Sequence, residues 1–211
     1  MTKRQIATNL FGPHAHYRKL LIGSDVEIAR RTLEDLTKQY GDVVHTEGAF
    51  WRYGDTEWET IPHDRIRPLV HGYDGAKFKT GSGRSSQVSL SKSRIDSVLY
   101  DCAALCSEPD FFENPLVGIN CASGFIRFDA AGAPHLDVHH RHCRCRHTLP
   151  GSWHPDMPCT PPDGSMLHYL LTGCFKGDPD AEAKCDLLAE VCGAAALGHA
   201  THLLQPRAVV L

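Results

Sequence analysis

LLTGCFKGDPDAEAKCDLLAEVCGAAALGHATHLLQPRAVVL, residues 170–211, predicts a helix followed by a short buried strand. Asp178 can cap the helix, with Pro179 at the first position, where a missing N–H costs nothing. Gly198 is a plausible stop. Apolar residues at 3.6-residue spacing form one stripe on this helix: Leu188, Val191, Cys192 and Ala195. The apolar run Ala208–Leu211 is typical of a buried parallel strand, although a terminal strand that only closes a sheet fits it equally.

The composition is that of an ordinary soluble globular chain. Its 211 residues suffice for one large domain or two small ones, with 42% hydrophobic and 22% charged residues. No apolar run is long enough to span a bilayer, and the N-terminal residues lack the apolar core of a secretion signal. We therefore expect a cytoplasmic protein with no membrane partner, whose nine cysteines are free thiols rather than disulfides.

Charge is distributed unevenly along the chain. The net charge is −3, which argues against a uniformly basic nucleic-acid coat. Residues 63–106, however, hold seven basic and four acidic residues, whereas residues 155–211 hold three basic and seven acidic ones. This asymmetry is compatible with one surface for nucleic acid and another for protein contacts.

A loosely held arm, residues 1–23, precedes the first predicted helix. Ser24 to Glu27 form a capping box, in which the serine hydroxyl accepts from the Glu27 N–H and the glutamate reaches back to the serine N–H. Gly41 is expected to end the helix. Its apolar stripe is predicted to comprise Val26, Ala29, Leu33, Leu36 and Tyr40.

Three short strands are predicted next, at 43–45, 49–53 and 57–61. The last two form an aromatic hairpin that turns near Gly54-Asp55. Two interpretations of its aromatic residues remain open, cross-strand packing or a stacking platform for bases, and they concern Trp51, Tyr53 and Trp58.

A helix at 64–73, interrupted by Pro68, is followed by a Gly/Ser-rich basic loop at 74–87. A second capping box, starting at Ser93, begins another helix. Its core stripe is predicted to be Ile95, Val98, Leu99, Cys102 and Cys106. Helix, basic turn and helix have the layout of a winged-helix or helix-turn-helix protein, although two packed helices with solvated basic ends fit as well.

After residue 109 the chain is predicted to be β-rich. Strands are expected at Val117–Cys121, Gly124–Phe128 and Pro134–Val138, with a turn at Ala131-Gly132 and a further strand at Arg144–Leu149. The Pro-rich connector Pro150–Ser165 then leads to a helical section that starts with Leu167–Phe175.

Residues 139–147, HHRHCRCRH, hold the residue types of a zinc site. Alternation along a strand would place Cys143, Cys145 and His147 on one face and His142 on the other. The spacing differs from that of a standard zinc knuckle, so a basic strand edge is the stronger interpretation. The chain also lacks a P-loop, a nucleophile elbow and an H-E-x-x-H motif, so no sequence motif makes it an enzyme.

Four blocks resemble the accessory region of phage- and plasmid-type DNA primase–helicases: FWRYGDTEWETIP (50–62), LSKSRIDSVL (90–99), GINCASGFIRF (118–128) and residues 170–211. The similarity extends from about Asp25 to Leu211. In that family the region precedes a superfamily-three helicase motor, and the final strand leads into the Walker A loop. Walker A and B residues and a recognisable primase site are absent here, which makes the chain a truncated product, a fragment or a stand-alone remnant.

The predicted helices and strands make this an α+β chain, and the resemblance implies that it acts in DNA replication. Its parts would be an arm at 1–23, a winged-helix-like unit at 24–108, a β-rich segment at 109–150, and a linker, helices and final strand at 151–211. The expected partners are DNA and the helicase motor. If the chain self-associates, the resemblance implies a hexamer, as in the full-length family. ATP and magnesium would bind only to the motor.

Basic side chains are the candidate DNA contacts. Five lie between the predicted helices or at the start of the second, and two form a further patch: Lys77, Lys79, Arg84, Lys92 and Arg94, then Arg144 and Arg146. The alternatives are a structural or oligomerisation module that uses the acidic helix and final strand, and a small zinc-binding module.

Overall fold

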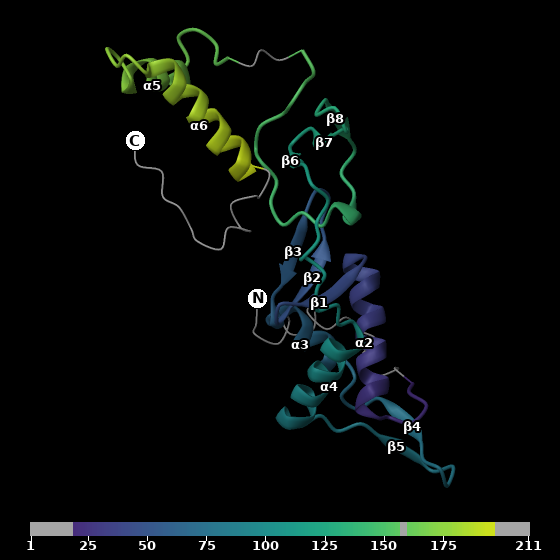
Figure 1. Ribbon diagram of the computed structural model, residues 1–211. Helices are drawn as coiled ribbons and strands as arrows, with labels where there is room; N and C mark the ends of the chain where they lie inside the picture. Colours follow the sequence, from purple (N-terminus) through teal and green to yellow (C-terminus); the bar gives the residue numbers. More distant parts are fainter. Residues whose placement is uncertain (1–18, 157–159, 197–211) are drawn as a thin grey trace, which may run out of the picture. The chain divides into compact units, whose positions relative to one another are not determined.

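The computed structural model describes residues 19–156 and 160–196. The chain is α+β, and its contacts divide it into two compact units (Figure 1). Unit 1 extends to Pro115 and includes Arg144–Arg146, whereas unit 2 comprises the remaining residues. None of the helices in the described ranges is long and apolar enough to cross a membrane.

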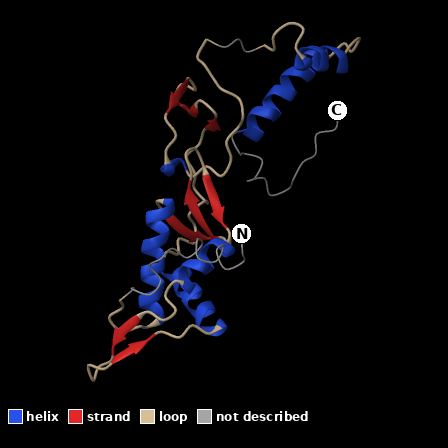
Figure 2. Cartoon of the chain, turned by 180° about the vertical axis from the view of Figure 1, so that it is seen from behind, coloured by secondary structure: helices blue, strands red, loops and turns tan. Residues whose placement is uncertain are grey.

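Three helices form the core of unit 1: α2 (Asp25–Tyr40), α3 (His63–His71) and α4 (Lys92–Leu105). They pack against one another, with the contact between α2 and α4 the most extensive (Figure 2). Because each helix contributes an apolar stripe, the shared core is almost entirely aliphatic. Its fully buried members include Ile28, Ala29, Leu36, Ile66, Val70, Val98 and Cys102.

Helix α2 starts and stops where the sequence predicts, but its details differ. The Ser24 hydroxyl accepts from the Glu27 N–H at 3.2 Å, and Gly41 ends the helix at φ 77°. The capping box is incomplete, because the Glu27 carboxylate binds residues 21–23 instead of reaching the Ser24 N–H. The predicted stripe is also wrong at Val26, which is 43% exposed, since packing on α4 buries Ile28 and Thr32 instead.

A three-stranded antiparallel sheet connects α2 to α3. Its strands are β1 (Val43–Thr46), β2 (Ala49–Tyr53) and β3 (Trp58–Ile61), in the order β1-β2-β3. The aromatic residues of the hairpin form a cluster with two phenylalanines that follow α4, through ring contacts at centroid distances of 4.8 to 6.4 Å. They therefore pack within the protein, as the first interpretation held; the cluster is Trp51, Tyr53, Trp58, Phe111 and Phe112.

The segment between α3 and α4 is a β-hairpin, so the predicted loop is wrong. Strands β4 (Lys77–Lys79) and β5 (Ser85–Gln87) pair antiparallel. Gly83, at φ 79°, donates to the Thr80 carbonyl at 2.7 Å and closes the turn. Each strand has only three residues, and Phe78 is the one apolar side chain among the six, so the strands are too short for a clear period-two signal. This hairpin also replaces the short turn of a helix-turn-helix layout.

Helix α4 has the predicted core stripe but begins earlier than predicted. Ser91, not Ser93, is the N-cap, and its hydroxyl accepts from the Arg94 N–H at 3.3 Å. Helix α3 accommodates Pro68 near its centre, where the neighbouring Ile66 and Val70 are fully buried. Burial in the core therefore outweighs the local penalty of the proline.

Unit 2 contains the antiparallel sheet β6 (Ile119–Cys121), β7 (Gly124–Phe128) and β8 (Pro134–Asp137), close to prediction. The predicted strand Arg144–Leu149 is wrong. Arg141–Cys143 form a 3₁₀ turn (η2), and Arg144 adopts φ 54°, which is incompatible with a strand. Of the predicted strand, only Leu149 forms a β-bridge, an isolated one with Cys121 of β6.

Helices α5 (Met166–Cys174) and α6 (Ala181–Ala196) bury none of their described side chains. Helix α6 begins later than predicted, since Asp178 accepts from the Asp180 N–H at 2.9 Å in the turn before it. Its predicted apolar stripe includes no buried side chain among the described residues. Gly198 and the strand Ala208–Leu211 lie outside the described residues.

Candidate nucleic-acid interface

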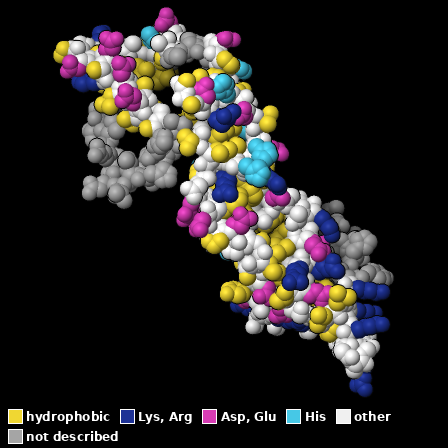
Figure 3. All heavy atoms as spheres, turned by 45° about the vertical axis from the view of Figure 1, so that its right-hand side comes forward, with side chains coloured by type: hydrophobic (Ala, Val, Ile, Leu, Met, Phe, Trp, Pro, Cys, Tyr) yellow, Lys and Arg dark blue, Asp and Glu magenta, His cyan; other side chains and the backbone are white. Residues whose placement is uncertain are grey.

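The β4–β5 hairpin carries the three basic residues that the sequence placed in a loop. Lys77 and Lys79 are exposed on β4, and Arg84 is exposed at the turn before β5. Among the described residues, none of these side chains has an ion-pair partner. Figure 3 shows Lys and Arg side chains gathered at this end of unit 1. The hairpin therefore presents positive charge that the fold does not neutralise.

A short extended segment, residues 19–22, lies beside β4. Lys19 forms a parallel bridge with Lys77, and the Leu20 N–H donates to the Lys77 carbonyl at 2.9 Å. This pairing brings the Lys19 ammonium, which the sequence placed in a loose arm, next to the hairpin cations. The strand pairing adds a fourth exposed cation to the same region of unit 1.

The carboxylate of Glu27 holds residues 21–23 in place through backbone hydrogen bonds. It accepts backbone hydrogen bonds from Leu21, Ile22 and Gly23 at 2.6, 2.9 and 2.8 Å. Burial alone would raise the pKa of Glu27, but these bonds outweigh it, and the pKa is lowered from 4.5. A charged Glu27 therefore holds the extended segment at neutral pH.

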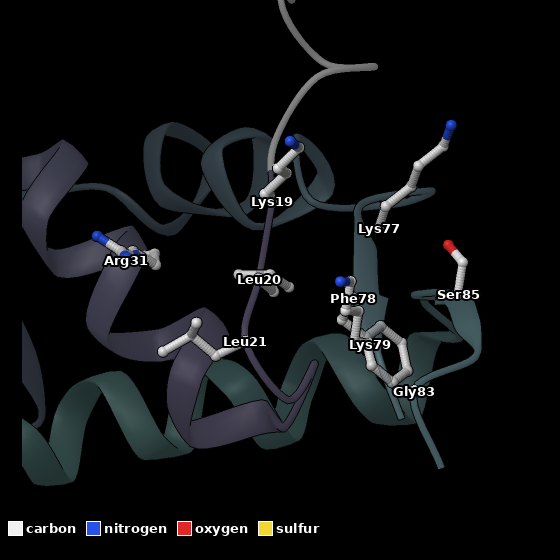
Figure 4. Close-up of a pocket in the computed structure, with 9 residues that line it drawn as sticks. All are labelled: Lys19, Leu20, Leu21, Arg31, Lys77, Phe78, Lys79, Gly83 and Ser85. Carbon is white, nitrogen blue, oxygen red and sulfur yellow. The ribbon is translucent and has the colours of Figure 1, made fainter. Parts of the chain in front are cut away.

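A groove of about 390 Å³ is lined by this segment, the hairpin and Arg31 of α2 (Figure 4). Its apolar lining comes from Leu20, Leu21 and Phe78. Its cationic lining comes from the segment, α2 and β4: Lys19, Arg31, Lys77 and Lys79. In Figure 4 the Lys19 and Lys77 side chains extend toward the same side of the view. An apolar floor beneath cations suits a ligand that combines a flat apolar group with negative charge.

Gly23 sets the position of the Phe78 ring at the end of the groove. At φ 71°, it has the ring so close that an added Cβ would lie 2.6 Å from the nearest ring carbon. Only glycine combines this backbone conformation with that contact.

Arg31 borders the groove from α2 but is paired. Its Nη1 donates to Glu34 Oε2 at 3.0 Å, and both side chains are about half exposed. The Glu34 hydrogen bond raises the pKa of Arg31 further. The unpaired charge of the groove thus comes from its lysines.

The two predicted cations of α4 have different surroundings. Lys92 is exposed at the first position of the helix and does not line the groove. Arg94 instead fastens α4 to the start of α2: its guanidinium donates to Asp25 Oδ1 at 2.7 Å, to the Gly23 carbonyl at 2.6 Å and to the Ser89 carbonyl at 3.2 Å. Its donors are therefore directed into the fold.

The second predicted patch is built into the aromatic cluster. Arg144 lies over the Phe111 ring at 4.7 Å and donates to the Phe111 carbonyl at 2.9 Å. Arg146 lies over Phe112 at 4.9 Å and pairs with Glu47 at 2.7 Å. Both guanidinium groups contribute to packing in unit 1.

The structure does not bring together the residues of the alternative zinc interpretation. Across 19–156 and 160–196, no three His, Cys, Asp or Glu side chains are grouped as a metal site. The period-two argument for the set fails, because its residues lie on a 3₁₀ turn and irregular backbone; they are His142, Cys143, Cys145 and His147.

The sequence singled out Lys77, Lys79 and Arg84 as candidate DNA contacts but not Lys19 and Leu21, which line the groove with Lys77 and Lys79. Residues 19–22 have no strand periodicity, and their pairing with β4 spans more than fifty positions of sequence. The one available signal was Glu27, placed to bind backbone N–H groups before the helix.

A scan against protein-family models, a search of curated proteins and a search of solved structures each returned no match for this chain.

Proposed function

We propose that this chain is a DNA-binding and coupling module of a primase–helicase that acts in DNA replication. The observation that carries the proposal is the group of cations on β4–β5 and the adjacent segment, left without acidic partners among the described residues: Lys19, Lys77, Lys79 and Arg84. The block resemblance supplies the replication context. In this proposal a separate motor binds ATP and unwinds DNA, because the sequence holds no Walker motif.

Phosphate neutralisation explains why unpaired lysines favour DNA. Each lysine that contacts a phosphate releases condensed counterions, so the affinity falls linearly with salt on a logarithmic scale. A projecting hairpin can follow a phosphate backbone without rearrangement of the helical core. The net charge of −3 does not oppose this, since attraction depends on the local field.

The test is fluorescence anisotropy with labelled single-stranded and forked DNA at about 50 and 200 mM salt. We expect salt-sensitive binding by the wild type. The double variant Lys77→Ala/Lys79→Ala should bind both DNAs more weakly, with a salt slope smaller by about one to two. Arg65→Ala is the matched control, because Arg65 is exposed on α3 and does not line the groove.

Two results would contradict the proposal. One is the absence of DNA binding at low salt. The other is binding that the double variant and the Arg65→Ala control weaken equally, which would indicate a diffuse charge effect rather than a hairpin site.

A second candidate function is self-association through α5. This helix exposes large apolar side chains and buries none: Met166 (84% exposed), Leu167, Tyr169 and Leu170. Such a face is typical of a protein contact. Light scattering across protein concentrations tests it: Leu167→Ser should reduce the apparent mass if α5 forms the contact, and a concentration-independent monomer would exclude it.

A further inference from the structure

Resting on the proposed function, we propose that the groove lined by residues 19–21 and β4 binds an unpaired strand of DNA, with one base on its apolar floor. The groove would make the module selective for single-stranded over duplex DNA. The cations on the hairpin alone imply attraction to any DNA and no such preference.

The first step of the argument is the chemistry of the floor. Leu21 is 77% exposed although it lines a groove, and Phe78 is partly exposed beside it. An aliphatic and an aromatic surface next to each other suit the flat face of a base. In a duplex that face is stacked inside the helix, so only an unpaired strand can offer it.

The second step is the charge that surrounds the floor. Lys19, Lys77 and Lys79 line the same groove as Leu21 and Phe78, and no described carboxylate pairs with any of the three. The nearby Glu34 is already paired with Arg31. A nucleotide strand has this combination, an apolar ring attached to an anionic backbone, whereas an apolar peptide or lipid tail would leave the lysines unmatched.

The third step is the rigidity of the groove walls. The Leu20 N–H bonds to Lys77, Glu27 fixes the N–H groups of residues 21–23, and Gly23 contacts the Phe78 ring. Both walls are therefore held before any ligand arrives, which lowers the entropic cost of binding.

The test uses the full chain with a labelled single strand of about 15 nucleotides and a duplex of the same length, titrated by anisotropy. We expect tighter binding of the single strand. Phe78→Leu, which retains apolar volume, should weaken single-strand binding about fivefold or more and leave duplex binding and the salt slope unchanged. Leu21→Ser should act in the same direction.

Ile22→Ser is the matched control, because Ile22 is 70% exposed on the same segment but does not line the groove. Equal weakening by Leu21→Ser and Ile22→Ser would overturn the inference, as would equal affinity for single strand and duplex. Salt-dependent binding without strand preference would agree with the proposed function and contradict only the proposed role of the groove. Absence of binding to either DNA would contradict both the proposed function and the proposed role of the groove.

Discussion

Glu27 has two roles, one for its backbone and one for its side chain. Its backbone N–H is capped by Ser24, while its carboxylate collects three N–H groups of the preceding segment. The negatively charged carboxylate belongs to the first turn of α2, where the helix dipole stabilises negative charge. A single carboxylate thus joins the start of a helix to one wall of the groove.

We predict that Glu27→Gln destabilises the fold by about 1 kcal/mol at neutral pH, because a neutral amide binds backbone N–H groups more weakly. The folded-state pKa of Glu27 lies below 4.5, so its stabilisation is complete above pH 4.5 and is lost as the pH falls through the folded value. Urea unfolding of both proteins across pH measures this. The difference between them should shrink below pH 4.5, and a difference that persists there would contradict the assignment.

At the scale of elements, Arg94 links the start of α4 to the start of α2 in addition to the apolar packing of the two helices. It lies at the start of α4, and its contacts reach Asp25 at the start of α2 and the Gly23 carbonyl before it. The same residue was a candidate DNA contact in the sequence, since an arginine near a helix start looks the same in either role. The structure separates it from Lys77 and Lys79, whose ammonium groups have no such partners in the described part of the chain.

We predict that Arg94→Ala and Lys77→Ala affect different properties: the first lowers stability, and the second weakens DNA binding. Arg94→Ala removes three internal hydrogen bonds and should destabilise unit 1 by about 1–3 kcal/mol. It should leave the salt slope of DNA binding unchanged. Lys77→Ala should reduce the salt slope by about one with little change in stability. Thermal unfolding and anisotropy, run on both variants, measure the two effects, and a reduced slope for Arg94→Ala would restore its role in DNA binding.

Across the whole molecule, burial divides the described cysteines by environment. Cys102 is fully buried in the helical core of unit 1, whereas Cys174 and Cys192 are exposed on α5 and α6. Burial raises the pKa of the Cys102 thiol to about 12 and that of Cys106 to about 11. The core thiols therefore behave as small apolar groups.

We predict that thiol alkylation at about pH 8 distinguishes these environments. Cys174 and Cys192 should react first, while Cys102 should react only after denaturation, since it has neither access nor a populated thiolate. Mass spectrometry of digested protein locates the labelled residues. Labelling of Cys102 at the rate of Cys174 in the native protein would contradict the described core.

Local signals in the sequence were sufficient for much of unit 1. Ser24 and Gly41 delimit α2, the apolar spacing from Ile95 to Cys102 identifies the core face of α4, and the aromatic hairpin turns at Gly54. Each of these depends on interactions within a few residues, so composition and spacing carry the information. They also carried the α+β class, which the structure confirms.

Tertiary structure alone decided which basic side chains are available to a ligand. The lysines of β4, Arg94 and Arg144 look alike in sequence, yet the fold directs Arg94 to Asp25 and Arg144 to Phe111. It also brings Lys19 and Leu21 to β4 through pairing across a long stretch of sequence. The sequence by itself determined where α2 begins and ends and which face α4 buries, because those are local properties. The groove and its free charge depend on contacts between distant segments, which only the folded chain creates.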